Sequence, residues 1–160
     1  FFMKTTYITR RETFNAAHKL WRPEWSDEKN WEVFGKCANQ NWHGHNFELW
    51  VTVKGTPDPD TGFIMNLKLL SQLVKTHIIE ALDHKNLNLD VPEFAHVNPT
   101  AENIAIVIHG LLRPHVPESL DLQITLGETP RNIVQFPADM HHNKMRSELR
   151  RLAAEAGNLA

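Results

Sequence analysis

Residues 45–55, HNFELWVTVKG, constrain the fold of this chain more than any other stretch. Apolar and polar residues alternate, so that Phe47, Leu49, Val51 and Val53 point to one face of an extended chain. This period of two is typical of a β-strand with one buried face. A cluster of turn-forming residues, KGTPDPDTG, follows the strand and ends it. The segment therefore predicts a sheet that is covered on one side.

The rest of the chain predicts the elements that cover this sheet. A looser alternation in TYITRRETFNAAH predicts another strand, which ends near His18, and FIMN predicts a short strand that completes a hairpin. Two segments have helical periodicity: residues 66–84 with Asn66 as N-cap, and a segment that starts at the N-cap Thr100 and runs towards Pro114. The apolar face of the first helix consists of Leu67, Leu70, Val74, Ile78 and Leu82. SLDLQITLGET and NIVQF predict two closing strands.

The order of these elements predicts an α+β fold, in which two helices back an antiparallel four-stranded sheet. We expect residues 1–138 to form a single domain and residues 139–160 to form a polar, alanine-rich helical tail. Between the first two long strands, residues 21–42 contain several aromatic side chains, which predict an ordered excursion rather than a disordered loop.

Composition excludes several classes of protein. The formal net charge of -2 gives no basic signature, so nucleic acid is a poor candidate partner. No apolar run approaches the roughly 20 residues that a membrane span needs. The chain has one cysteine, Cys37, which cannot form an intrachain disulfide and favours a reducing compartment. We therefore expect a cytoplasmic protein.

The sequence just before the best-defined strand indicates a metal site. Residues two apart in a strand share a face, so His43 and His45 can hold one ion at about 2.0 Å each. His18 is the best candidate for a third ligand, because it also ends a strand. Three histidines with an open fourth position are typical of catalytic zinc. The alternative is that each imidazole is satisfied by an ordinary hydrogen bond.

Six segments together resemble the 6-pyruvoyl-tetrahydropterin synthase family. In chain order they are FNAAH, FGKCANQNWHGHNFELWVTVKG, DPDTGFIMNL, ALDHKNLNLDVPEF, PTAENIA and GETPRNIVQF. The resemblance runs from about Phe14 to about Phe136 without large gaps. It also includes the related 6-carboxytetrahydropterin synthases, although the five residues between Cys37 and His43 are typical of the pyruvoyl enzymes.

The resemblance implies a fold, an assembly and a set of site residues. The family fold is the T-fold, in which subunits join their sheets into a barrel and assemble as a hexamer of two trimers. The family's zinc ligands match His18, His43 and His45. Its catalytic cysteine matches Cys37, and its aspartate–histidine pair, supplied by a neighbouring subunit, matches Asp83 and His84. The pterin-anchoring glutamate matches Glu128, and Thr100 lies where the family places further pterin contacts.

The reaction implied by the resemblance starts from 7,8-dihydroneopterin triphosphate and eliminates triphosphate. Zinc would hold the side-chain hydroxyls as a Lewis acid. Cys37 would act as the base and Asp83 would orient His84, while Glu128 would accept two hydrogen bonds from the pterin edge. No external redox cofactor is required. Charge alone points to Lys19, Arg22 and Lys36 as partners for the triphosphate.

Two other functions stay open at this stage. One is 6-carboxytetrahydropterin synthesis in the deazapurine route, from the same substrate and at the same zinc site. The other is a non-catalytic zinc- or pterin-binding module. The sequence departs from the family at Trp42, where a smaller residue is more usual, and at Ala101, where a second threonine is common. Because Trp42 precedes a proposed ligand, it puts the product in doubt.

Overall fold

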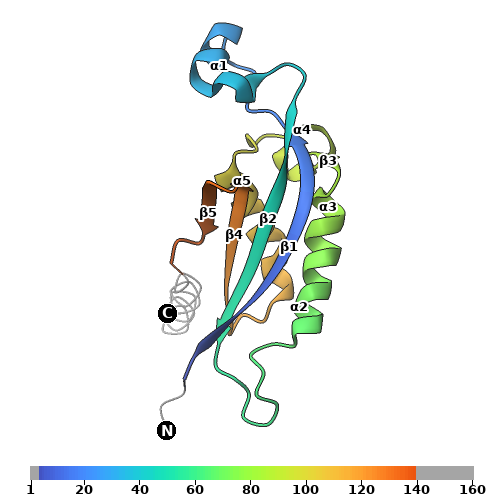
Figure 1. Ribbon diagram of the computed structural model, residues 1–160, viewed down its shortest axis with the longest axis vertical. Helices are drawn as coiled ribbons and strands as arrows, with labels where there is room; N and C mark the ends of the chain where they lie inside the picture. Colours follow the sequence, from blue (N-terminus) through green and yellow to red (C-terminus); the bar gives the residue numbers. More distant parts are fainter. Residues whose placement is uncertain (1–3, 140–160) are drawn as a thin grey trace, which may run out of the picture.

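Five strands form one sheet within residues 4–139, which are the residues that the computed structural model describes. Their order across the sheet is β3-β1-β2-β4-β5. The strands are β1 (Thr6–His18), β2 (His43–Gly55), β3 (Lys85–Asn86), β4 (Asp121–Thr129) and β5 (Asn132–Phe136). Figure 1 shows β1 and β2 as a long twisted ribbon that runs through the molecule.

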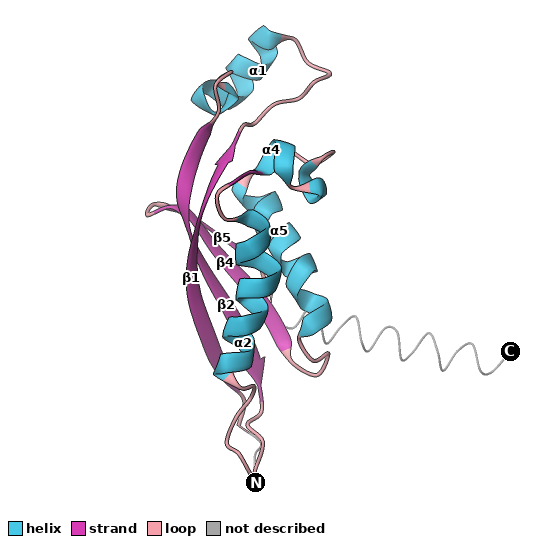
Figure 2. Ribbon diagram, turned by 90° about the vertical axis from the view of Figure 1, so that its right-hand side faces the viewer, coloured by secondary structure: helices cyan, strands magenta, loops and turns pink. Residues whose placement is uncertain are grey.

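The helices lie on one side of this sheet, apart from one at its end. They are α1 (Asp27–Phe34), α2 (Leu67–Val74), α3 (Glu80–Leu82), α4 (Leu87–Asp90) and α5 (Ala101–Leu112). A π-helical turn, Lys75–Ile79, joins α2 to α3 in one continuous rod. In Figure 2 this rod and α5 cover one face of the sheet, whereas α1 lies beyond the end of the β1–β2 ribbon. The predicted α+β class is confirmed.

The core lies between the sheet and these two helices. The alternating side chains of β2 that the sequence assigned to one face, Phe47 to Val53, are all fully buried. They pack in one cluster with residues of the other elements: Leu122, Ile124 and Leu126 of β4, Leu70, Val74, Ile78 and Leu82 of the α2–α3 rod, and Ile104, Ile108 and Leu112 of α5. Both predicted N-caps also form, because Asn66 accepts from the Lys68 amide and Thr100 accepts from the Asn103 amide.

The sheet differs from the predicted four-stranded one in two places. The segment FIMN, residues 63–66, is not a strand. Asp58 closes a turn by accepting hydrogen bonds from the Asp60 and Thr61 amides, and Asn66 already caps α2, so little chain remains for pairing. The additional strand is β3, which pairs parallel with β1 through only two residues. A pairing this short leaves no periodic pattern in a sequence.

One residue assigned to the core is exposed. Leu67 is 54% exposed, although the other four members of its predicted stripe are buried. A helical side chain covers the turn that precedes its own Cα, and Leu67 begins α2, so it has no preceding helical turn to cover. The helical tail that the sequence predicts for residues 139–160 lies, beyond Asp139, outside the described residues.

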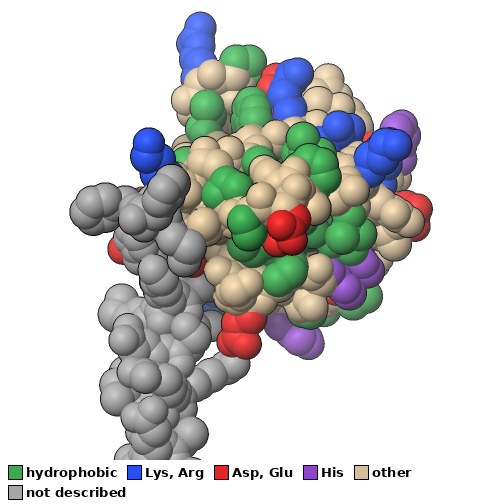
Figure 3. Space-filling model, turned by 90° about the horizontal axis from the view of Figure 1, so that it is seen from below, with side chains coloured by type: hydrophobic (Ala, Val, Ile, Leu, Met, Phe, Trp, Pro, Cys, Tyr) green, Lys and Arg blue, Asp and Glu red, His purple; other side chains and the backbone are tan. Residues whose placement is uncertain are grey.

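The surface carries no strong charge field on the face that Figure 3 displays. At the end of the molecule opposite α1, acidic, basic and apolar side chains are interspersed over the described residues. None of the described helices is both long and apolar enough to cross a membrane.

Candidate active site

The register of the β1–β2 ribbon brings three histidines together. His18 and His43 are direct partners in the antiparallel ladder, and His45 lies two residues further along on the same face of β2. One ring nitrogen from each of the three lies within 4.8 Å of the other two. Two nitrogens bound to one zinc ion are at most about 4.2 Å apart, so the triad is close to the spacing that an ion requires.

The hydrogen bonding of His18 prepares it as a metal ligand. Its Nδ1 lies 2.8 Å from the carbonyl oxygen of Pro99, which fixes Nδ1 as the protonated donor and leaves a lone pair on Nε2. His18 Nε2 and His43 Nδ1 are buried and have no hydrogen-bond partner among the described residues. Imidazoles satisfied by ordinary hydrogen bonds would not leave these two nitrogens unpaired, so the triad fits a metal ion.

Burial also favours the neutral, metal-binding form of His18 and His43. His18 is 1% exposed, and burial lowers its pKa to about 4 despite the opposing hydrogen bond to Pro99. Burial lowers the pKa of His43 as well, and the neighbouring His45 adds to the effect. Both rings are therefore neutral near pH 7, as ligand imidazoles must be.

A carboxylate stands beside the triad. The alternation of Leu122, Ile124 and Leu126 on the core face of β4 continues to Glu128. Its Oε1 lies 3.6 Å from His18 Nε2 and 3.7 Å from His45 Nε2. The structure thus places Glu128, which the sequence predicted to anchor the pterin, next to the histidine cluster.

Cys37 approaches the same carboxylate from the excursion between β1 and β2. It lies in a short 3₁₀ turn, Gly35–Ala38, and its carbonyl oxygen accepts a hydrogen bond from the Leu20 amide at 2.9 Å. The thiol is half-buried, and burial raises its pKa. The negative charge of Glu128 raises this pKa further. The chain alone therefore holds Cys37 as a protonated thiol, and a nearby positive charge is needed to make it a base.

Asp83 and His84 form a pair at the edge of β1 that β3 joins. His84 Nδ1 lies 2.8 Å from Asp83 Oδ2, and the other carboxylate oxygen of Asp83 accepts from the Asn15 amide at 2.8 Å. The Asn15 hydrogen bond holds the pKa of Asp83 below its usual range. His84 has a left-handed backbone, with φ 57°, and its ring is 83% exposed.

Within one chain this pair is separate from the triad. Asn15 lies three residues before His18, or roughly 10 Å along the strand, and its side chain faces the other side of the sheet. The His84 ring turns outward to solvent, so the geometry leaves it accessible to a second chain.

Some contacts of the site have no sequence signal. The Pro99 carbonyl that orients His18 is a backbone group, and only the fold places it there. His96 is exposed and lines a pocket together with Lys19 and Arg22, whereas Lys36 does not line that pocket. Thr100 caps α5 next to Pro99, which gives it a structural role close to the triad.

These features define a class: an α+β protein whose histidine triad, at the end of the central ribbon, could hold a metal ion beside a carboxylate and a thiol. Comparison with known proteins gives the family. The profile of the family described as 6-pyruvoyl tetrahydropterin synthase matches residues 7–139, so the chain belongs to that family.

Individual relatives agree with this assignment. The 6-pyruvoyl tetrahydrobiopterin synthase of Poecilia reticulata is 47% identical over 130 residues, which is 81% of this chain and 88% of that protein. The one from Pongo abelii is 44% identical over 132 residues, 82% of this chain and 91% of that protein. The solved structure of Caenorhabditis elegans 6-pyruvoyl tetrahydropterin synthase matches with a TM-score of 0.81 and 35% identity, covering 87% of this chain and 99% of that one.

Proposed function

We propose that this chain is a zinc-dependent 6-pyruvoyl-tetrahydropterin synthase, a lyase that converts 7,8-dihydroneopterin triphosphate to 6-pyruvoyl-tetrahydropterin and releases triphosphate. The observation that carries the proposal is the histidine triad, which has two buried, unpaired ring nitrogens and lies next to the Glu128 carboxylate. Membership of the family supports the choice of substrate.

His18, His43 and His45 would hold the zinc ion. Zinc bound there supplies a Lewis acid that makes protons on the substrate side chain easier to remove. The contribution of the protein is orientation: the Pro99 carbonyl fixes the tautomer of His18, and the ladder pairing fixes its position relative to His43.

Cys37 would remove the proton from the side-chain carbon of the substrate. Because burial and Glu128 raise the pKa of this thiol, it becomes an effective base only beside added positive charge. His84, oriented by Asp83 and contributed by a neighbouring subunit, would supply part of that charge in its protonated form. The exposed ring of His84 and its short hydrogen bond to Asp83 support this role.

Glu128 would anchor the pterin. An ionised carboxylate can accept two parallel hydrogen bonds from the amino-pyrimidine edge, which fixes the ring and discriminates against rings that lack those donors. Its position beside His18 and His45 would set the pterin side chain over the metal. Thr100 is a second candidate for pterin contact, from the start of α5.

The assembly would be a hexamer of two trimers in the cytoplasm, with sheets joined into a barrel and active sites between subunits. Two observations support a shared site: the outward-facing Asp83–His84 pair, and the edge of β1 before Asn15, which pairs with no other strand in the described part of the chain. Residues 1–138 would form the catalytic domain, with residues 139–160 as a tail.

Product analysis tests the proposed reaction. The zinc-loaded protein is incubated with 7,8-dihydroneopterin triphosphate, and the products are identified by mass spectrometry. A six-position pyruvoyl side chain together with free triphosphate is the expected result. A six-carboxy pterin would instead assign the chain to 6-carboxytetrahydropterin synthesis with the same residues. Zinc binding without turnover would leave a non-catalytic binding module.

A further inference from the structure

The short loop that carries the Pro99 carbonyl is held by side chains to which the proposed chemistry gives no role. The loop consists of Asn98, Pro99 and Thr100, and it leads directly into α5. Pro99 is buried, and its carbonyl oxygen lies 2.8 Å from His18 Nδ1. The proline ring fixes its own φ and restricts the backbone of the residue before it. The direction of the carbonyl then depends on how the two ends of the loop are anchored.

Asn103, in the first turn of α5, anchors the loop from the helix side. Its side-chain amide donates to the Asn98 carbonyl oxygen at 2.8 Å, and the same oxygen accepts from the Thr100 amide at 2.8 Å. The backbone amide of Asn103 donates to the Thr100 hydroxyl at 3.3 Å. Asn103 therefore contacts the residue before Pro99 and the residue after it, so the carbonyl between them depends on this one residue.

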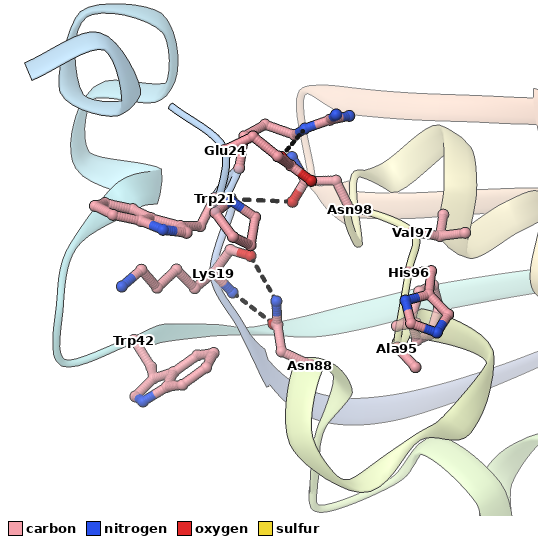
Figure 4. Close-up of a pocket in the computed structure, with 12 residues that line it drawn as sticks. Lys19, Trp21, Glu24, Trp42, Asn88, Ala95, His96, Val97 and Asn98 are labelled. Atoms are coloured by element: carbon pink, nitrogen blue, oxygen red, sulfur yellow. Dashed lines mark hydrogen bonds and ion pairs between the residues drawn. The ribbon is translucent and has the colours of Figure 1, made fainter. Parts of the chain in front are cut away.

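Asparagine side chains also anchor the end of β1, where the other partner of the contact lies. Asn88 pairs with both backbone groups of Lys19, each at 2.9 Å, and Lys19 directly follows His18. Asn98 Oδ1 accepts from the Trp21 amide at 3.2 Å, which ties the loop to the chain leaving β1 (Figure 4). The histidine and the carbonyl are thus both held on anchored backbone.

This anchoring matters because a rival acceptor lies on the other side of the His18 ring. Glu128 Oε1 is 3.6 Å from His18 Nε2, slightly beyond hydrogen-bond length. A neutral imidazole carries one proton, and the hydrogen bond at one nitrogen sets the state of the other. A proton on Nε2 would face Glu128 and block the lone pair that a metal ion needs. The Pro99 carbonyl, at 2.8 Å, keeps the proton on Nδ1 instead.

We propose that Asn103 is a positioning residue of the metal centre: through the Asn98 carbonyl it holds the Pro99 carbonyl on His18 Nδ1, which keeps Nε2 free for the ion. The inference rests on the proposed function, because it takes the triad as the zinc site. The side chain of Asn103 acts as a donor, so a residue of the same shape that only accepts cannot replace it. A merely structural role at the start of α5 would instead affect stability and leave His18 unchanged.

Two variants and a control separate these roles. Asn103→Asp keeps the shape of the side chain and adds a charge that is favourable at a helix N-terminus, but it removes the donor. Asn103→Ala removes the donor without adding charge. Asn66→Ala is the control, because Asn66 caps α2 by accepting from the Lys68 amide at 2.8 Å, and α2 begins at the end of the sheet opposite to α1 (Figure 1). Urea unfolding establishes that each variant is folded under the assay conditions.

Two readouts that need no turnover follow His18. The first is solid-state NMR of metal-free, ¹⁵N-histidine-labelled protein near pH 7, which distinguishes protonated from unprotonated ring nitrogens; His18→Gln identifies the signal. The parent and Asn66→Ala should show the proton on Nδ1, and both Asn103 variants should show a fraction with the proton on Nε2. The second is zinc affinity, measured by competition with a chelator. It should fall about tenfold in both Asn103 variants and stay unchanged in Asn66→Ala.

The combined results distinguish failure of the positioning role from failure of the function. If the parent binds zinc and the Asn103 variants keep its tautomer and affinity, the positioning role is overturned and the metal site stands. A change in only one of the two readouts also overturns it, because the role links the tautomer to the affinity. If the parent binds no zinc but the Asn103 variants change the tautomer, the control of the tautomer stands and the proposed function is overturned.

Discussion

Replacing Asn30 by alanine should destabilise the segment between β1 and β2 that carries Trp21, Arg22 and Cys37. Asn30 is fully buried although it is polar, and its side chain accepts from the Arg22 amide and donates to the carbonyls of Arg22 and Ser26. Asn30→Ala leaves the Arg22 amide without its acceptor, and a buried donor left unpaired costs about 1–3 kcal/mol. The lost donations add about 1 kcal/mol more, because the freed carbonyls can still find other partners.

Hydrogen exchange measured at single amides is the appropriate assay. A local cost of about 2–4 kcal/mol corresponds to roughly 30- to 900-fold faster exchange of the Arg22 amide. The unfolding free energy in urea should fall by the same amount or less, since the excursion can open while the sheet stays folded. Asn39→Ala is the control: Asn39 lies in the same excursion, but the hydrogen bond that its side chain accepts from the Asn41 amide is exposed to solvent. Equal exchange rates at Arg22 in the two variants would refute the role of Asn30 as the anchor.

Three further predictions concern the site itself. Cys37→Ala should lower turnover at least hundredfold while zinc stays bound, as loss of a general base does; undiminished turnover would exclude the thiol as the base. Glu128→Gln should raise KM about tenfold or more for the pterin substrate, because a neutral amide replaces one charged acceptor by a donor, and an unchanged KM would place the pterin elsewhere. The metal-free protein should lose about 3 kcal/mol of unfolding free energy as the pH falls from 6.5 to 4. In that window unfolded His18 takes up a proton, while the folded residue, with its pKa lowered to about 4, does not. The same titration of His18→Gln should show a shallower slope, and identical slopes would contradict the assignment.

Local sequence patterns were sufficient to predict the strand and the helices that surround the site. The alternation in β2 predicted its buried face, and the N-caps Asn66 and Thr100 predicted where two helices begin. The same alternation placed His43 and His45 on one face. These features depend on neighbours in sequence, which is why a single sequence contains them.

Features that depend on long-range contacts were missed or predicted wrongly. FIMN has strand-forming residues, but the turn closed by Asp58 and the start of α2 compete for the same segment. The two residues of β3 acquire their structure only from contact with β1. The Pro99 carbonyl reaches His18 across 81 positions of sequence, so no local pattern could reveal it. Asp83 and His84 keep their proposed role only if another chain completes the site.

The pairing of His18 with His43 limits how the central ribbon can change in length. Side chains alternate between faces, so a single inserted or deleted residue in β1 or β2 sends every later side chain of that strand to the opposite face. Such a change between Phe14 and His18 would either expose the histidine or bury Ala17 in its place. Insertions or deletions of an even number of residues in both strands would move the three histidines along the ribbon but keep them on one face. Whether the histidine triad survives an insertion or deletion in this ribbon thus depends on whether the number of residues is odd or even, as well as on its size.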